Sequence, residues 1–153
     1  MPNHVINILK IKTKEPKKVI EELGENIDFE KIVPMPDNIF RGNLGQRERE
    51  LYGENNWYDW SLKNWGTKWN AYDQAGPFEG ENYVEYIFST AWSCPFYVYV
   101  ALAKKYDIEV KYADEDIGFN CGRIKSKNGV IIIHKTAKDY KDSRAYANKV
   151  WRW

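Results

Sequence analysis

The residues of this chain with the greatest capacity for recognition chemistry are aromatic rings interleaved with amide and lysine side chains. Four of the seven tryptophans fall within residues 56–73. A flat base or sugar can stack on such rings while amides contact its polar edges, and each stacked base contributes on the order of 1–3 kcal/mol. The candidate ligand-contacting residues are Asn64, Trp65, Lys68, Trp69, Asn70 and Trp92.

The same rings can instead build a core. On a helix over residues 55–65, the large side chains spread over an arc of roughly 200°, which leaves too little polar circumference to display all of them. We therefore assign Trp57 and Trp60 to the core of a deeply buried helix and place the exposed contact at the helix-to-strand junction, residues 64–70. Asn64 falls within the apolar arc, so we expect it to cap the helix end or to meet a ligand.

Catalytic signatures are scarce. The chain has two histidines and shows no zinc, nucleophile-elbow or phosphate-loop pattern. The best metal candidate is the acidic turn Asp114-Glu115-Asp116, whose carboxylates could hold a divalent cation, although EF-hand spacing is absent and a solvated turn is the alternative. A metal-dependent enzyme acting on a nucleotide or nucleic acid is therefore a second hypothesis, and no metal or cofactor is assigned to the chain.

Two cysteines and one histidine have simpler interpretations than catalysis. Cys94 follows Ser93 at the expected start of a helix, where the helix N-terminus could lower the thiol pKa, but a packing role is the expectation. His134 ends a run of three isoleucines and is expected to be structural. Cys94 and Cys121 lack the spacing of a metal site or a disulfide framework, which favours reduced thiols in a cytosolic protein.

Length and charge set further limits. At 153 residues the chain fits one domain over 1–153, and its formal net charge of +1 provides no global field for attracting a polyanion. Nucleic-acid binding would need a local patch, and acidic neighbours dilute the lysine clusters near the first strand and the last hairpin. The first residues do not form a signal peptide and no apolar run matches a membrane span, so we expect a soluble cytoplasmic protein without a membrane partner.

Hydrophobic periodicity predicts the elements that must position these residues. The expected strands cover 4–12, 67–73, 83–92, 108–113, 119–127 and 130–135, residues 29–33 are a short extended piece, and the expected helices begin at Pro16, Gln46, Asn55, Pro95 and Ala137. Gly76-Pro77 and Gly80 mark the turn after the second strand, and Asn128-Gly129 predicts a type I′ turn.

This order predicts an α+β fold. It is a ferredoxin-like split βαβ plan with a mostly antiparallel sheet, helices on one face, a helical insertion and a C-terminal helix that docks through its tryptophans.

The tryptophan motifs also resemble a known family. They read Asn-Trp-Tyr at 56–58, Asn-Trp-Gly-Thr-Lys-Trp-Asn at 64–70 and Phe-Ser-Thr-Ala-Trp-Ser-Cys-Pro at 88–95. In this order they are similar to the paired motifs of the Api92-like, or YubB ferredoxin-like, domains, which occur mainly in bacteriophages, plasmids and other mobile elements. The resemblance implies a ferredoxin-like fold and no established activity. Cys94 stands where the family usually has proline, which weakens any shared thiol chemistry.

Three hypotheses follow for function. The leading one is a non-catalytic binding module of phage or mobile-element origin that contacts a host or phage macromolecule, or a small ligand, through residues 64–70 with Trp92 nearby. The second is the metal-dependent enzyme described above. The third is a structural or oligomerising module whose exposed strand edges pair with another chain.

Overall fold

Alternation of side chains along residues 4–12 produces the central strand of the protein. The computed structural model describes residues 3–116 and 120–151 and places β1 at His4–Lys12. The other described strands are β2 (Tyr72–Glu79), β3 (Tyr83–Ala91), β4 (Asp107–Asp114), β5 (Cys121–Lys127) and β6 (Val130–Thr136). The described helices are α1 (Pro16–Leu23), α2 (Phe29–Ile32), α3 (Gln46–Tyr52), α4 (Trp57–Asn64), α5 (Phe96–Ala103) and α6 (Tyr140–Trp151). None of these described helices is both long and apolar enough to cross a membrane.

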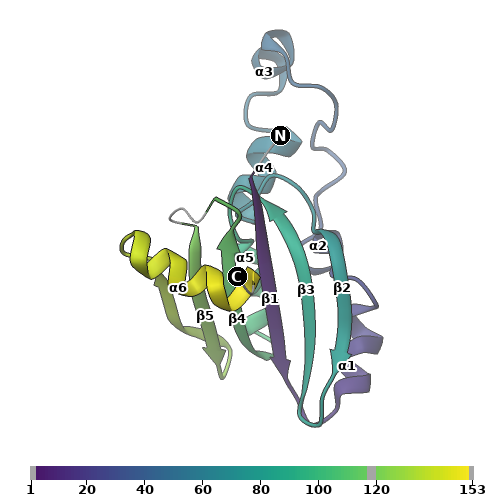
Figure 1. Cartoon of the computed structure of the whole chain (residues 1–153). Helices are drawn as coiled ribbons and strands as arrows, with labels where there is room; N and C mark the ends of the chain where they lie inside the picture. The colour runs from purple at the N-terminus through teal and green to yellow at the C-terminus, as the bar shows by residue number, and fades with distance from the viewer. Residues whose placement is uncertain (1–2, 117–119, 152–153) are drawn as a thin grey trace.

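The described strands form one antiparallel sheet in the order β2-β3-β1-β4-β5-β6 (Figure 1). The order β2-β3-β1-β4, with α1 and α5 in the connections, is that of two interlocked β-α-β units. The predicted α+β split βαβ plan is therefore confirmed. β5 and β6 extend the sheet as a hairpin whose turn residues, Asn128 and Gly129, have φ of 53° and 89°, as the predicted type I′ turn requires.

One face of the sheet, which we call the core face, carries the main hydrophobic core. On β1 it consists of Val5, Asn7, Leu9 and Ile11, and all four side chains are fully buried. Helices α1, α2 and α5 lie behind this face in Figure 1 and supply apolar side chains to the same cluster. Removal of this apolar surface from water contributes roughly 25 cal/mol per Å² and is the main source of stability.

Asn7 is the polar residue among these four on β1, and its hydrogen bonds account for its burial. Its side-chain oxygen accepts a bond from the Tyr99 hydroxyl (2.8 Å), and its Nδ2 donates to Thr90 Oγ1 (3.0 Å). Thr90 in turn donates to the carbonyl of Ser93 (2.7 Å). This chain of bonds joins β1, β3 and α5. It also allows these polar side chains to be buried, because a buried polar group is tolerated only when its hydrogen-bonding partners are present.

The opposite face, which we call the outer face, carries Ile6, Ile8 and Lys10 on β1. Helix α6 crosses it over β1, β4 and β5 (Figure 1), and Ala147 packs there in a cluster with Cys121. The prediction that the helices cover one face is therefore wrong for α6. The physical reason is that strand residues on this side, Ile6 and Cys121 among them, are apolar near one end of the sheet and need a cover.

The expected docking of the C-terminal helix through its tryptophans is not visible in the described side chains. Ala147, Val150 and the partly buried Tyr146 make the described apolar contacts of α6. Trp153 and the side chain of Trp151 lie outside the described residues. Phe119, where the fifth strand was expected to begin, also lies outside them, and β5 is described from Cys121.

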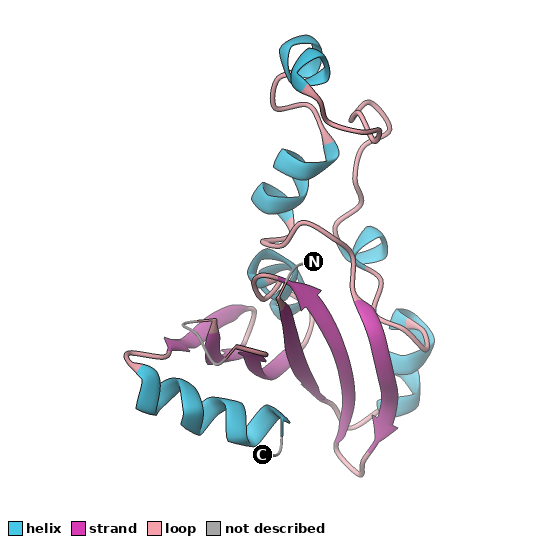
Figure 2. Ribbon diagram, turned by 45° about the horizontal axis from the view of Figure 1, so that its top comes forward, coloured by secondary structure: helices cyan, strands magenta, loops and turns pink. Residues whose placement is uncertain are grey.

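Residues 34–64, which we call the helical arm, extend beyond the end of the sheet (Figure 2). Phe40 holds the two halves of the arm together: its backbone bridges Asn56, and its ring stacks on Tyr52 with centroids 4.3 Å apart. Helix α3 buries none of its residues, and α4 buries only Ser61. The expectation of a deeply buried helix over 55–65 is therefore wrong.

The rings of α4 are half-buried because this helix lies on the edge of the core. Trp57 and Trp60 pack against the core without entering it, and Trp57 Nε1 donates a hydrogen bond to the Gly42 carbonyl (3.0 Å). Leu62, which falls within the predicted apolar arc, is exposed. Helical periodicity identified the ring-bearing side of α4 but could not tell how much of that side a neighbour covers.

Two short segments also differ from the prediction. Residues 29–32 are the helix α2, because Asp28 caps it by accepting a bond from the Glu30 backbone N–H (3.0 Å). The second strand is Tyr72–Glu79 and not 67–73, and Gly76-Pro77 lies within it at the second of two register shifts. The turn to β3 falls at Gly80, whose N–H bonds the Tyr83 carbonyl (2.9 Å).

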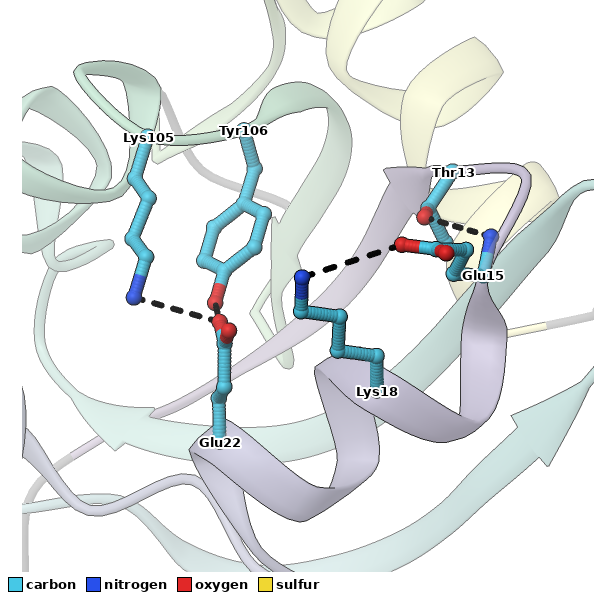
Figure 3. A network of polar contacts seen from close by, with 6 residues as sticks. All are labelled: Thr13, Glu15, Lys18, Glu22, Lys105 and Tyr106. Atoms are coloured by element: carbon cyan, nitrogen blue, oxygen red, sulfur yellow. Dashed lines mark hydrogen bonds and ion pairs between the residues drawn. The ribbon is translucent and has the colours of Figure 1, made fainter.

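A polar network ties α1 to the end of α5 (Figure 3). Glu22 accepts a short hydrogen bond from the Tyr106 hydroxyl and pairs with Lys105 at 3.1 Å. The Tyr106 hydrogen bond, followed by the one from Lys105, lowers the pKa of Glu22. Lys18 and Glu15 pair more loosely at 3.9 Å on the same helix, so the firm tie between the elements is the Glu22 carboxylate.

Candidate functional site

The junction between α4 and β2, where the sequence places the ligand contact, is built into the framework of the sheet. Gly66 has φ of 88°, and a Cβ there would lie 3.0 Å from the Phe96 backbone nitrogen, so this position suits glycine. Thr67 Oγ1 donates to the Ala91 carbonyl (2.7 Å), and Ser93 Oγ donates to the Gly66 carbonyl (2.6 Å). These bonds fasten the junction to the end of β3.

Trp65, one of the predicted contact residues, is part of the core. Its side chain is 4% exposed, and its Nε1 donates to the Val33 carbonyl (2.8 Å). Phe29 and Trp60 meet the ring edge-on, with centroids 5.6 and 5.3 Å away. The indole therefore has a complete set of protein neighbours and presents no ring face to solvent.

Asn64 and Asn70, the two amides among the predicted contact residues, form hydrogen bonds within the protein. Asn64 Nδ2 donates to the Trp60 carbonyl (2.9 Å), so Asn64 satisfies the helix end, which was one of its two expected roles. Asn70 Oδ1 accepts from the Phe29 N–H (2.8 Å), and its Nδ2 donates to Asp28 Oδ1 (2.8 Å). Asn70 thus fixes the start of α2, 41 residues earlier in the chain.

Trp69 is the exposed member of the junction, and the partly exposed Lys68 lies against its ring. Trp69 is 40% exposed, and the Lys68 ammonium lies 4.2 Å from the centroid of its ring, a cation–π contact. The other edge of the indole meets Tyr72 at 6.3 Å, and the Tyr72 hydroxyl lies 2.6 Å from His4 Nδ1. Burial, with a smaller effect of Asp73, raises the pKa of Tyr72, which stays a neutral hydrogen-bonding phenol.

Trp92 is exposed on a constrained backbone. Its side chain is 49% exposed, and its φ of 70° is unusual for a residue with a side chain. Two hydrogen bonds hold that conformation: the Trp92 N–H donates to the Asn3 carbonyl (2.9 Å), and Asn120 Nδ2 donates to the Trp92 carbonyl (2.6 Å).

Trp69, Tyr72, His4 and Trp92 thus gather where β1 begins and β3 ends, since His4 pairs with Ala91. We call these four residues the aromatic end of the sheet. It combines two exposed indoles with a phenol–imidazole pair, an arrangement suited to recognising an apolar or aromatic surface.

A separate groove lies beside Asn64, on the helical arm. Its volume is about 690 Å³, and Asn55, Asp59, Trp60 and Lys63 are among its lining residues. Acidic, amide and basic side chains share the lining, so no single ligand charge is favoured. The groove is the feature of this region that could accept a small ligand.

The acidic turn divides its carboxylates among separate tasks. Glu115 Oε1 accepts from the His4 N–H (3.1 Å), and Asp116 Oδ2 accepts from Asn3 Nδ2 (2.6 Å), while Asp114 is buried at the end of β4. Within residues 3–116 and 120–151, no three His, Cys, Asp or Glu side chains are grouped so that they could hold a metal ion. The carboxylates of Glu115 and Asp116 thus connect the segment after β4 to the start of β1.

The two thiols are packed as the sequence suggests, and His134 lies against a ring. Burial raises the pKa of Cys94 to about 12 and outweighs the opposing hydrogen bond with Tyr112. Burial also raises the pKa of Cys121 to about 11. His134 stacks on Phe96 with centroids 4.6 Å apart, and burial lowers its pKa. Neither thiol is an activated nucleophile.

Two of the exposed rings outside the predicted contact residues share one face of the sheet. Phe78 and Tyr83 lie on the outer face of β2 and β3, and Phe78 pairs with Glu85 across the strands. The signal for Tyr83 was present: it alternates with the core residues Val84 and Tyr86 and must point to the other face. The register shifts in β2 hid the same signal at Phe78.

The chain was also compared with known proteins. The family model described as "Ferredoxin-like domain in Api92-like protein" matches residues 64–149, which is more than half of the chain. The match runs from the α4–β2 junction through all strands after β1 and most of α6. Searches of curated proteins and of solved structures return no match to this chain.

Proposed function

This chain belongs to the family of ferredoxin-like domains in Api92-like proteins, and from that premise we propose that it is a non-catalytic binding module. It contacts a host or phage macromolecule through the aromatic end of its sheet. The setting that we propose is the cytoplasm of a bacterium that carries a phage or another mobile element.

The observation that carries this proposal is the pair of exposed tryptophans, Trp69 and Trp92. Tryptophan is over-represented among the residues that dominate the energy of protein interfaces. Hydrogen bonds hold the backbone at Trp92 and on either side of Trp69, so little conformational entropy is lost when a partner covers the rings. A protein has little structural reason to leave two indoles 40% and 49% exposed at one end of a sheet.

Other features support a binding role over a catalytic one. The carboxylates of Glu115 and Asp116 accept hydrogen bonds from His4 and Asn3, and the pKa of Cys94 near 12 keeps that thiol protonated at neutral pH. The groove beside Asn64 is the alternative ligand site, and a small molecule bound there would contact α4 and not the aromatic end.

The experiment is a quantitative affinity capture from host lysate with the tagged protein and three variants. Trp69→Ala and Trp92→Ala each remove one exposed ring, and Tyr140→Ala removes an exposed ring on α6 as a matched control. We expect proteins enriched by wild type to be retained by Tyr140→Ala and to fall at least about tenfold with each tryptophan variant, since a hot-spot side chain is worth 2 kcal/mol or more. Melting temperatures establish that the variants are folded. Unchanged enrichment with both tryptophan variants would refute the proposal.

A second candidate, an oligomerising module, is supported by the edge strand β6. Val130 and Ile132 on this strand are more than half exposed, and apolar edge strands pair readily with other chains. Light scattering over a hundredfold range of concentration tests the candidate. A monomer at every concentration contradicts it.

A further inference from the structure

The outer face is uncovered on the side of the sheet away from α6. Figure 1 looks onto this face and shows β1, β3 and β2 in front of the core-face helices, with α6 crossing only the other half. The strand register aligns one complete row of side chains across the six described strands: Phe78, Glu85, Lys10, Glu109, Lys125 and Ile133. The neighbouring row includes Ile8, Lys111 and Arg123.

Two neighbouring hollows on this face share Lys10 and Glu109 in their linings. The first has a volume of about 710 Å³ and is lined by Lys10, Lys12, Lys14 and Tyr83 together with Glu109. The second has a volume of about 370 Å³ and extends from Lys10 and Glu109 toward α6. It adds the cations Lys111, Arg123, Lys125 and Lys149, and the acid Glu85.

The charge of this surface contrasts with the near neutrality of the chain. Seven basic side chains and two acidic ones line the two hollows, whereas the whole chain has a net charge of +1. Glu109 is shared between Lys12 (2.8 Å) and Lys125 (3.6 Å), and the Lys12 hydrogen bond is the largest cause that lowers its pKa. Among the described residues, no ion pair within 4.0 Å engages Lys111, Arg123 or Lys149.

Aromatic rings border the same surface. Phe78 is 49% exposed and Tyr83 is 37% exposed, and the Lys10 ammonium lies 4.7 Å from the centroid of the Tyr83 ring. Tyr83 folds over the β2–β3 turn, where a Cβ at Gly80 would lie 2.2 Å from the ring. The aromatic end continues this border along β2, because Tyr72 pairs with Ser89 on the same face.

We propose that the uncovered outer face binds single-stranded nucleic acid, with bases stacked on Phe78 and Tyr83 and phosphates bound by the cations of the two hollows. Rings beside a basic track match this ligand, because every base has a stacking face and every nucleotide carries a phosphate. A duplex is a poorer match since its base faces are already stacked. Sheet surfaces with exposed aromatic residues bind single-stranded RNA in this manner.

The test is fluorescence anisotropy with labelled 12-residue oligo-dT and oligo-U and the full chain. We expect both oligonucleotides to bind, with the logarithm of the association constant falling linearly with the logarithm of salt concentration, at a slope of about −0.7 per phosphate contact. Phe78→Ala should weaken binding by about 5- to 100-fold, the loss of one stacked base.

The charge contribution is tested with two triple variants of equal net charge. Lys111→Ala, Arg123→Ala and Lys149→Ala together should weaken binding at least about tenfold and reduce the salt slope. The control combines Lys17→Ala, Lys31→Ala and Lys104→Ala, three exposed lysines on α1, α2 and the end of α5. It should bind as wild type does. Melting temperatures confirm that each variant is folded.

Three results would overturn the proposal. The first is no binding with protein at about 100 μM in low salt, where even non-specific sites are occupied. The second is an equal loss in the two triple variants. The third is displacement of the oligonucleotide by polyglutamate at matched charge concentration with no effect of Phe78→Ala, which would identify an acidic protein surface as the ligand.

This inference adds a second partner class to the proposed binding role and can fail independently of it. Lysate capture repeated after nuclease treatment reports on the aromatic end alone. Partners that persist there while the oligonucleotides fail to bind refute only the nucleic-acid surface. Oligonucleotide binding without any tryptophan-dependent partner refutes only the proposed macromolecular contact at Trp69 and Trp92.

Discussion

The two faces of the sheet are built from alternate residues of the same strands, yet they have different compositions. On the core face of β1, Leu9 and Ile11 are fully buried beneath three helices. On the outer face, Ile6 and Ile8 lie near α6, and the next two residues are Lys10 and Lys12. Adjacent residues of β1 thus face opposite sides of the sheet, one toward the packed core and the next toward a surface that can bind a partner.

This difference shows which constraint acts on each face. The core face is covered along its length, so its side chains must be apolar or fully hydrogen-bonded, as Asn7 and Tyr99 are. Burial raises the pKa of Tyr99 well above its usual value, which keeps the phenol as a donor to Asn7. The outer face is covered only beneath α6, so the rest of it tolerates the lysines, glutamates and exposed rings that a binding surface needs.

The largest expected difference in stability between the two faces comes from substitutions at neighbouring residues of β1. Leu9→Ala should lower the free energy of unfolding by about 2–5 kcal/mol, because it removes a fully buried side chain and leaves a cavity. Ile8→Ala, on the outer face, should cost roughly 1 kcal/mol, because partial exposure reduces the hydrophobic loss. Urea denaturation measures both values. Equal losses in the two variants would show that the faces do not differ in their contribution to stability.

A smaller effect is expected where α6 covers the outer face. Ala147→Asp places a carboxylate at a fully buried position beside Cys121 and should cost about 1–3 kcal/mol, limited by local detachment of the helix. Ala145→Asp, at an exposed position of the same helix, should cost less than about 0.5 kcal/mol.

Hydrogen exchange is the sharper measurement for α6. We expect Ala147→Asp to lose protection in α6 while the amides of β1 keep theirs. Loss of protection in all strands together would mean that the outer face contributes to the global core as much as the core face does.

The smallest effect concerns the polar tie between α1 and α5. The pKa of Glu22 is lowered in the folded protein, so its contribution to stability is present above the unfolded pKa and is lost as pH falls through the lower folded value. Tyr106→Phe removes the largest cause of that shift, and the fall in melting temperature between about pH 5 and 3 should become shallower.

Tyr140→Phe, which alters an exposed phenol on α6, serves as the control for this pH series and should match wild type. The same acid limb in wild type and Tyr106→Phe would show that the Tyr106 bond is not a source of the pH dependence. The pH dependence would then come from other groups, such as the Glu22–Lys105 ion pair.

Much of the fold was predictable because it depends on local periodicity. Alternation located β1, and Asn128-Gly129 located the last hairpin, since both signals are contained in a few neighbouring residues. The errors fall where the local structure depends on contacts with residues that are distant in the sequence. The link before β2 is held by hydrogen bonds with the backbone of Ala91 and Phe29. The face of the sheet that α6 covers depends on which apolar side chains strand pairing brings together around Ala113.

The candidate site was predicted less completely than the fold. The sequence predicted a ligand contact at residues 64–70 with Trp92, which stays a prediction, and the expected role of Asn64 as a helix-end cap matches its bond to Trp60. It could not tell which of Trp65 and Trp69 is exposed, because the two residues carry the same side chain and have similar neighbours along the chain. Only the packing of Phe29 and Val33 against Trp65 buries one ring and leaves the other exposed.

The sequence by itself determined the class of fold, the family and the types of side chain available, because periodicity and motif order are properties of consecutive residues. The tertiary structure decided which of these side chains face solvent and which share a surface. Phe78, Lys10 and Lys125 come from segments far apart in the chain, and strand register alone brings them into one row. Exposure and proximity depend on such long-range pairing, which no local pattern encodes.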